Sequence, residues 1–80
     1  MERKYELGSM PLFVGDSMSI STLAEMATNY NSCKSDKIEL QEKNEQLIIS
    51  WNQKSFIFKK DVGKFFELSV VVEPGKEESK

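Results

Sequence analysis

Four short runs between residues 37 and 72 alternate apolar and polar residues, and this alternation constrains the fold more than any other feature of the chain. Successive side chains of a β-strand point to opposite faces, so residues two apart share a face. The pattern therefore predicts an antiparallel four-stranded meander with one buried face. The residues expected on that face are Ile38 and Leu40, then Leu47, Ile49 and Trp51, then Phe56 and Phe58, and finally Phe66, Leu68, Val70 and Val72.

Short polar segments separate these runs and suit hairpin turns. They are residues 42–45, residues 52–53 and residues 61–63. Asn, Asp and Gly are favoured in such turns because they tolerate backbone conformations that other residues avoid. Upstream, residues 5–7 and residues 12–14 are expected to pair as a hairpin, or else to form an irregular arm over the core.

One amphipathic helix is predicted over residues 19–30. Its apolar stripe comprises Ile20, Leu23, Ala24, Ala27 and Tyr30, at helical spacing. Thr22 and Glu25 fit a capping box at its start, and Ser19 is an alternative cap one turn earlier. With the meander, this helix predicts a small α+β domain over residues 1–75, in which the helix packs on one face of a sheet of four to five short strands. Residues 76–80 are expected to form a charged flexible tail.

The composition argues against several functions. The chain of 80 residues has no His and a single Cys, so it lacks the commonest general base and any thiolate cluster for a metal. We therefore expect no enzyme activity, no cofactor and no metal. A chain this short is not expected to hold a deep cleft of several hundred Å³, the usual volume of a small-molecule site, so no small-molecule substrate is expected.

Location and charge give weaker constraints. No apolar run approaches the ~20 residues that span a bilayer, and the N-terminus does not resemble a signal peptide. The lone Cys33 suits a reducing compartment, so a cytoplasmic protein is expected. The net charge of −2 is too small to indicate a nucleic-acid or membrane partner. The low Arg content with many Lys and Asn would suit an AT-rich bacterial or phage genome.

Residues 51–66 are the one local exception in charge, because Lys side chains alternate there with aromatic residues. Such a segment is typical of single-stranded nucleic-acid binding through phosphate neutralisation and base stacking. Most of its aromatic residues fall on the predicted core face, however, so this function is the less favoured alternative. Its candidate residues are Lys54, Lys59, Lys60, Lys64 and Phe65.

The favoured function is protein binding, because the second face of the meander is not cleanly polar. Candidate partner-binding residues are Ile48, Ile57, Phe65 and Val71, with Lys59 at the border. A contiguous exposed apolar patch usually marks a contact surface. The N-terminal arm folded over this face is the competing explanation. The sequence thus predicts an adaptor, inhibitor or regulatory subunit that binds a protein partner or forms a homodimer. A structural subunit that contributes its sheet edge to a larger assembly is a further alternative.

Overall fold

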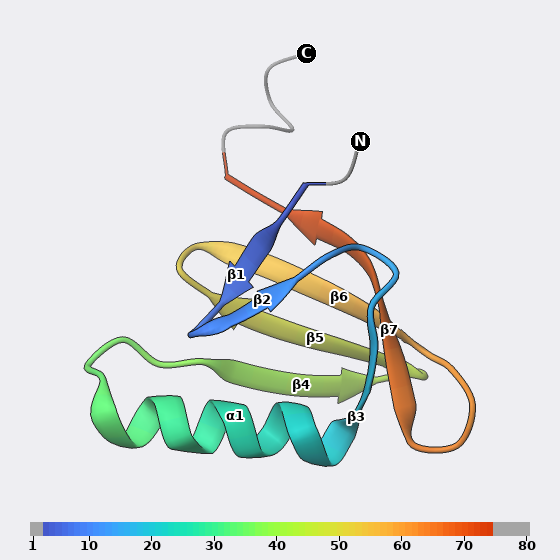
Figure 1. The fold of residues 1–80 in the computed structure, drawn as a ribbon, viewed down its shortest axis with the longest axis horizontal. Coiled ribbons are helices and arrows are strands. Elements are labelled where there is room, and N and C mark those ends of the chain that lie inside the picture. Colours follow the sequence, from blue (N-terminus) through green and yellow to red (C-terminus); the bar gives the residue numbers. More distant parts are fainter. Residues whose placement is uncertain (1–2, 75–80) are drawn as a thin grey trace.

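The computed structural model describes residues 3–74, and it confirms an α+β fold with an antiparallel sheet and one helix packed against it. The meander consists of β4 (Glu39–Lys43), β5 (Gln46–Trp51), β6 (Lys54–Lys60) and β7 (Phe65–Val72). A fifth strand that the sequence pattern did not predict, β3 (Ser17–Ser19), pairs with β7, so the strand order is β3-β7-β6-β5-β4 (Figure 1).

Two-residue turns fix the register of the meander. Asn44 and Glu45 join β4 to β5, and Asn52 and Gln53 join β5 to β6, with all four φ angles between 51° and 63°. Positive φ at both central residues defines the type I′ turn, whose twist matches that of the flanking strands. The predicted turn over residues 42–45 is therefore tighter than expected, because Glu42 and Lys43 remain in β4.

The buried face of the sheet agrees with the alternation over most of its length. Its fully or almost fully buried residues are Ile38, Leu47, Ile49, Phe56, Phe58, Phe66 and Leu68. Trp51, which was expected to be largely buried, is only partly so, and it packs against the edge of the core.

A β-bulge overturns the prediction for the end of β7. Phe58 pairs with Leu68 but Ile57 pairs with Val70, so Ser69 is an extra residue on β7. An extra residue shifts the alternation by one position. Val71 consequently packs against the core, whereas Val70 and Val72, predicted to be core residues, are 45% and 40% exposed.

Helix α1 spans Ile20–Cys33, three residues longer than predicted at its C-terminal end. Its N-cap is Ser19, whose Oγ accepts a hydrogen bond of 3.2 Å from the Thr22 backbone N–H. The predicted capping box starting at Thr22 is therefore wrong. Ser19 is the last residue of β3, so the helix begins where its pairing with β7 ends.

The helix buries a narrower stripe than expected. Leu23 and Ala27 are buried, and Ile20, Met26 and Tyr30 pack partly buried against the core. Ala24, which was assigned to the stripe, is exposed. A helix with two buried residues cannot cover a sheet of five strands, so another element must complete this layer.

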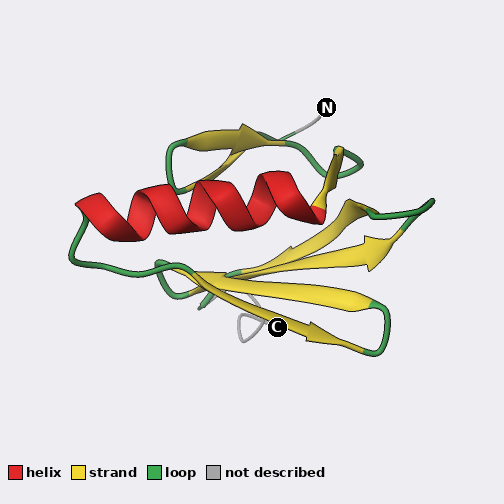
Figure 2. Ribbon diagram, turned by 90° about the horizontal axis from the view of Figure 1, so that it is seen from below, coloured by secondary structure: helices red, strands yellow, loops and turns green. Residues whose placement is uncertain are grey.

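That element is an N-terminal hairpin made of β1 (Tyr5–Leu7) and β2 (Met10–Leu12). The pairing was predicted, but the second strand lies two residues earlier than expected. Leu7 and Leu12 are fully buried, and the Tyr5 ring packs edge-on against Phe56 with the centroids 6.5 Å apart. Figure 2 shows the hairpin and α1 on the same side of the five-stranded sheet. The arm therefore covers the helix side and not the second face.

Candidate functional site

The outer face of the sheet, meaning the face opposite α1 and the hairpin, carries an apolar row across adjacent strands. In the register of the meander, Ile48 lies opposite Ile57, and Ile57 lies opposite Val70. Ile48 and Ile57 are partly buried and Val70 is 45% exposed. Figure 2 shows no helix or strand from residues 3–74 over this face. The row is therefore contiguous and open to solvent in the described part of the chain.

Three of the five predicted partner-binding residues lie on or beside this row. Ile48 and Ile57 form its centre, and Lys59 lies two residues along β6 from Ile57 on the same face. Val71 does not belong to it, because the bulge turns Val71 toward the core. Val70 takes its place in the row, and Val72 lies on the same face opposite Ser55. Sequence reasoning missed both valines because it continued the alternation past Ser69.

Phe65 is on the outer face but apart from the row. It is 49% exposed and stands two residues before Glu67, which lies opposite Lys59. This opposite-charge pair separates the Phe65 ring from Ile57. On the other side of the row, Ser50 lies opposite Ser55. The outer face thus has an apolar centre with a serine border and a charged border, and Phe65 stands beyond the charged one.

The residues proposed for nucleic-acid binding are not brought together. Lys54 begins β6 next to the β5–β6 turn, whereas Lys59 and Lys60 end the same strand. A strand rises about 3.3 Å per residue, which places them roughly 17–20 Å apart. Lys64 and Phe65 lie with Lys59 and Lys60 at the β6–β7 end, where Asp61 and Glu67 reduce the positive charge. The structure supplies no continuous basic path along the five residues.

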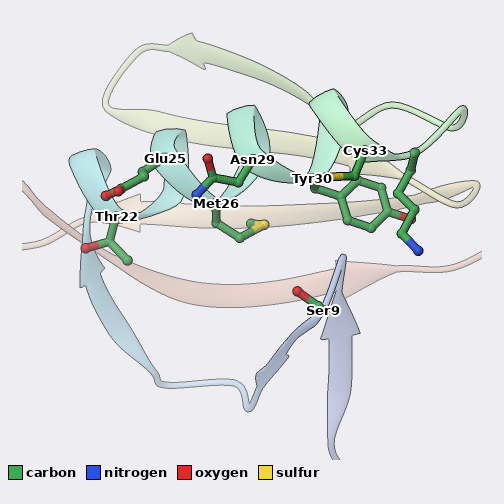
Figure 3. A pocket seen from close by; sticks show the side chains of 8 residues that line it. Ser9, Thr22, Glu25, Met26, Asn29, Tyr30 and Cys33 are labelled. Carbon is green, nitrogen blue, oxygen red and sulfur yellow. The ribbon is translucent and has the colours of Figure 1, made fainter.

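A groove on the helix side was not expected from the sequence. It lies between α1 and the tip of the hairpin, with a volume of about 490 Å³, and Met26 and Tyr30 line its centre opposite Ser9 (Figure 3). The hairpin approaches closely because Gly8 has φ +64°, and a Cβ there would lie 3.1 Å from both Ile38 Cδ1 and Tyr30 Cδ2. Its remaining lining residues are Thr22, Glu25, Asn29, Cys33 and Lys34.

Cys33 and Glu25 contribute a thiol and a carboxylate to the lining of the groove. No group of three or more His, Cys, Asp or Glu is placed to hold a metal within residues 3–74. Cys33 is exposed and lies 3.7 Å from the Ser32 hydroxyl, which is not a base that would activate the thiol. The volume of the groove lies in the range of several hundred Å³ that was not expected of a chain this short, because the hairpin packs beside α1 and leaves a groove between two elements that are distant in sequence.

Beside the groove, two aromatic residues share one carboxylate. Asp36 accepts hydrogen bonds from Tyr30 Oη at 2.9 Å and from Trp51 Nε1 at 3.1 Å, and the two rings meet edge-on with centroids 5.7 Å apart. The hydrogen bond from Tyr30 is the main cause that lowers the pKa of Asp36. Burial, followed by the hydrogen bond to Asp36, raises the pKa of Tyr30. This cluster joins the end of α1 to β5.

We expect the cluster to make stability depend on pH. A carboxyl whose pKa is lowered in the folded state stabilises the fold at pH values above its ordinary pKa of 3.8. This contribution is lost as the pH falls through the pKa that the carboxyl has in the folded state. Tyr30→Phe removes the main donor, so its melting temperature should lie below that of the unmodified chain above pH 4, and the gap should narrow with acidification. Thermal melts followed by Trp51 fluorescence measure this. A gap that stays constant down to the lowest pH would contradict the role of Asp36.

Comparisons with protein-family models, curated proteins and solved structures found no match to this chain. Helix α1 is too short and too polar to cross a membrane, and no other helix occurs in the part of the chain that the structure describes.

Proposed function

We propose that this chain is a small non-catalytic protein-binding module, acting as an adaptor, inhibitor or regulatory subunit through the outer face of its sheet. The observation that carries the proposal is the row formed by Ile48, Ile57 and Val70 on three adjacent strands. Single exposed apolar residues are common on protein surfaces, but a contiguous row with a polar border is typical of contact surfaces.

The way the core is completed also supports the proposal. Leu7 and Leu12 of the hairpin are fully buried on the helix side of the sheet. The hairpin is therefore packed on that side and does not cover the outer face. A second copy of the chain or a different protein is therefore the occupant that we propose. A reducing compartment such as the cytoplasm suits the exposed Cys33 and belongs to the same proposal.

Ile57→Lys tests the outer face directly. Ile57 projects away from the core, so the change should alter the free energy of unfolding by only about 0.5 kcal/mol. It should weaken association roughly tenfold or more, because a lysine would lie in a desolvated contact without a partner charge. The measurements are a melting curve, sizing over a range of concentrations, and a titration with the protein that co-purifies from the native host.

Thr28→Lys is the matched control, since Thr28 is exposed on α1, on the other side of the sheet. It adds the same charge and should leave both stability and association unchanged. If Ile57→Lys unfolds the chain while affinity per folded molecule is retained, the row is part of the core and the proposal fails.

A further inference from the structure

Two residues of β4 direct their backbone N–H and C=O groups away from the sheet, at its open edge. β4 is an edge strand, and its two-residue turn makes Lys43 and Gln46 a hydrogen-bonded pair. Pairs alternate along an antiparallel ladder, so the N–H and C=O groups of Leu40 and Glu42 point away from β5. Within residues 3–74, neither backbone takes part in a hydrogen bond outside the strand ladder.

Asn31 of α1 already uses the next position of the same edge. Its side-chain amide donates to the Ile38 carbonyl at 2.9 Å and accepts from the Ile38 N–H at 2.7 Å. These are the two bonds that a neighbouring strand residue would make. Asn31 thus closes the edge at Ile38, and the segment that remains open runs from Leu40 to Glu42.

Leu40 leaves apolar surface exposed beside this segment. Leu40 points to the core side but remains partly exposed, so the core is not sealed at this edge. Helix α1 runs alongside β4 (Figure 1). Ala24 lies seven residues before Asn31 and therefore on the same side of the helix, and it is exposed.

A second copy of β4 is a poor occupant of this edge. Paired strands lie about 4.8 Å apart, and symmetric pairing would carry each α1 toward its copy on the same side of the joined sheet. Packed helices need 8–10 Å between their axes. An extended segment that carries no helix beside it avoids this conflict.

We propose that the β4 edge binds an extended segment of a partner protein by antiparallel strand addition. Glu39 and Lys43 lie on the outer face at the two ends of the strand, so they select a lysine and a glutamate, respectively, on the segment. An apolar residue of the segment lies opposite Leu40. This inference rests on the proposed role in protein binding but uses a different surface from Ile57.

Peptide titrations followed by NMR test the proposal. The probe is the capped peptide Thr-Glu-Lys-Thr-Val-Lys-Thr, which places Val opposite Leu40, the second Lys opposite Glu39 and Glu opposite Lys43. At millimolar peptide, the amide signals of Leu40 and Glu42 should shift and exchange more slowly with solvent. Thr-Lys-Lys-Thr-Val-Glu-Thr has the same composition with the two end charges exchanged, and it should bind at least about fivefold more weakly.

Two methylated peptides test the backbone pairing. Methylation of the Val nitrogen removes an N–H that points at β4 and should abolish binding, whereas methylation of the central Thr nitrogen, which points away, should preserve it. On the protein, Glu42→Pro removes only an outward N–H and should also abolish binding. If this variant does not fold, the methylated pair still decides the question.

Several results would overturn the edge site. One is the absence of any amide shift at millimolar peptide, or shifts confined to other strands. Another is equal binding of the two peptides with exchanged charges. A third is a shift of the Leu40 and Glu42 amides that depends on protein concentration without peptide, which would indicate a second copy. Ile57→Lys should leave peptide binding unchanged. Failure of the edge site and failure of the outer face are therefore distinguishable.

Discussion

Phe58→Ala is expected to lower the free energy of unfolding by about 3–5 kcal/mol, the usual cost of removing a buried phenylalanine ring. Phe58 is fully buried and lies between Leu47 on β5 and Leu68 on β7. The cost within this range depends on how far the neighbouring side chains can move into the cavity. A domain of this size typically has little more stability than this loss.

Urea or thermal unfolding measures the change, and Phe65→Ala is the control. Phe65 is on the outer face of the same sheet and 49% exposed, so its loss should cost far less than that of Phe58. Since Phe58→Ala is expected to be largely unfolded, Phe58→Leu provides a folded variant with a smaller loss. A change below about 1 kcal/mol for Phe58→Ala would mean that the two faces of the sheet are assigned in reverse.

The sequence predicted the core of the sheet because its alternation is regular from Leu47 to Leu68. It failed beyond that point for a physical reason. Ser69 is the extra residue of the bulge, and it is followed by three consecutive valines that fit either face equally well. Only the pairing with β6 decides that Val71 is inside and Val70 outside. That pairing is a long-range contact that local periodicity does not contain.

The start of the helix shows the same limit. Ser19 and Thr22 both have suitable side chains for an N-cap, and the local pattern favoured Thr22 through Glu25. In the structure, Ser19 is held extended by its pairing with Phe65, and the next N–H, that of Ile20, donates to the Lys64 carbonyl. Contacts with a turn more than forty residues away thus select the cap.

The groove was missed because it forms between elements that are distant in sequence. Its two walls come from the hairpin tip at Ser9 and from Met26 and Tyr30 of α1. An isolated Gly8 in the sequence indicated only a turn, although its lack of a side chain is what permits close packing against Tyr30. The side of the sheet on which the hairpin lies was equally undetermined, since Leu7 and Leu12 would have suited either face.

Leu12→Ala should reveal how far the fold depends on that hairpin. We expect a loss of about 2–5 kcal/mol, because Leu12 is fully buried against the core although it belongs to a strand of only three residues. An isolated two-stranded hairpin is marginal in water, so β1 and β2 are held chiefly by this packing. Their displacement would expose part of the sheet face that α1 does not cover.

The extent of unfolding in Leu12→Ala shows whether the hairpin is part of the cooperative core or can detach while α1 and the sheet stay folded. If the hairpin completes the core, amide exchange should accelerate throughout β5 and β6, and the whole chain should unfold in one transition at a lower temperature. Val14→Ala is the matched control, since Val14 follows the same strand but is 49% exposed, and it should change stability little. Faster exchange confined to β1 and β2, with β5 and β6 protected as before, would show that α1 and the sheet form a stable core without the hairpin.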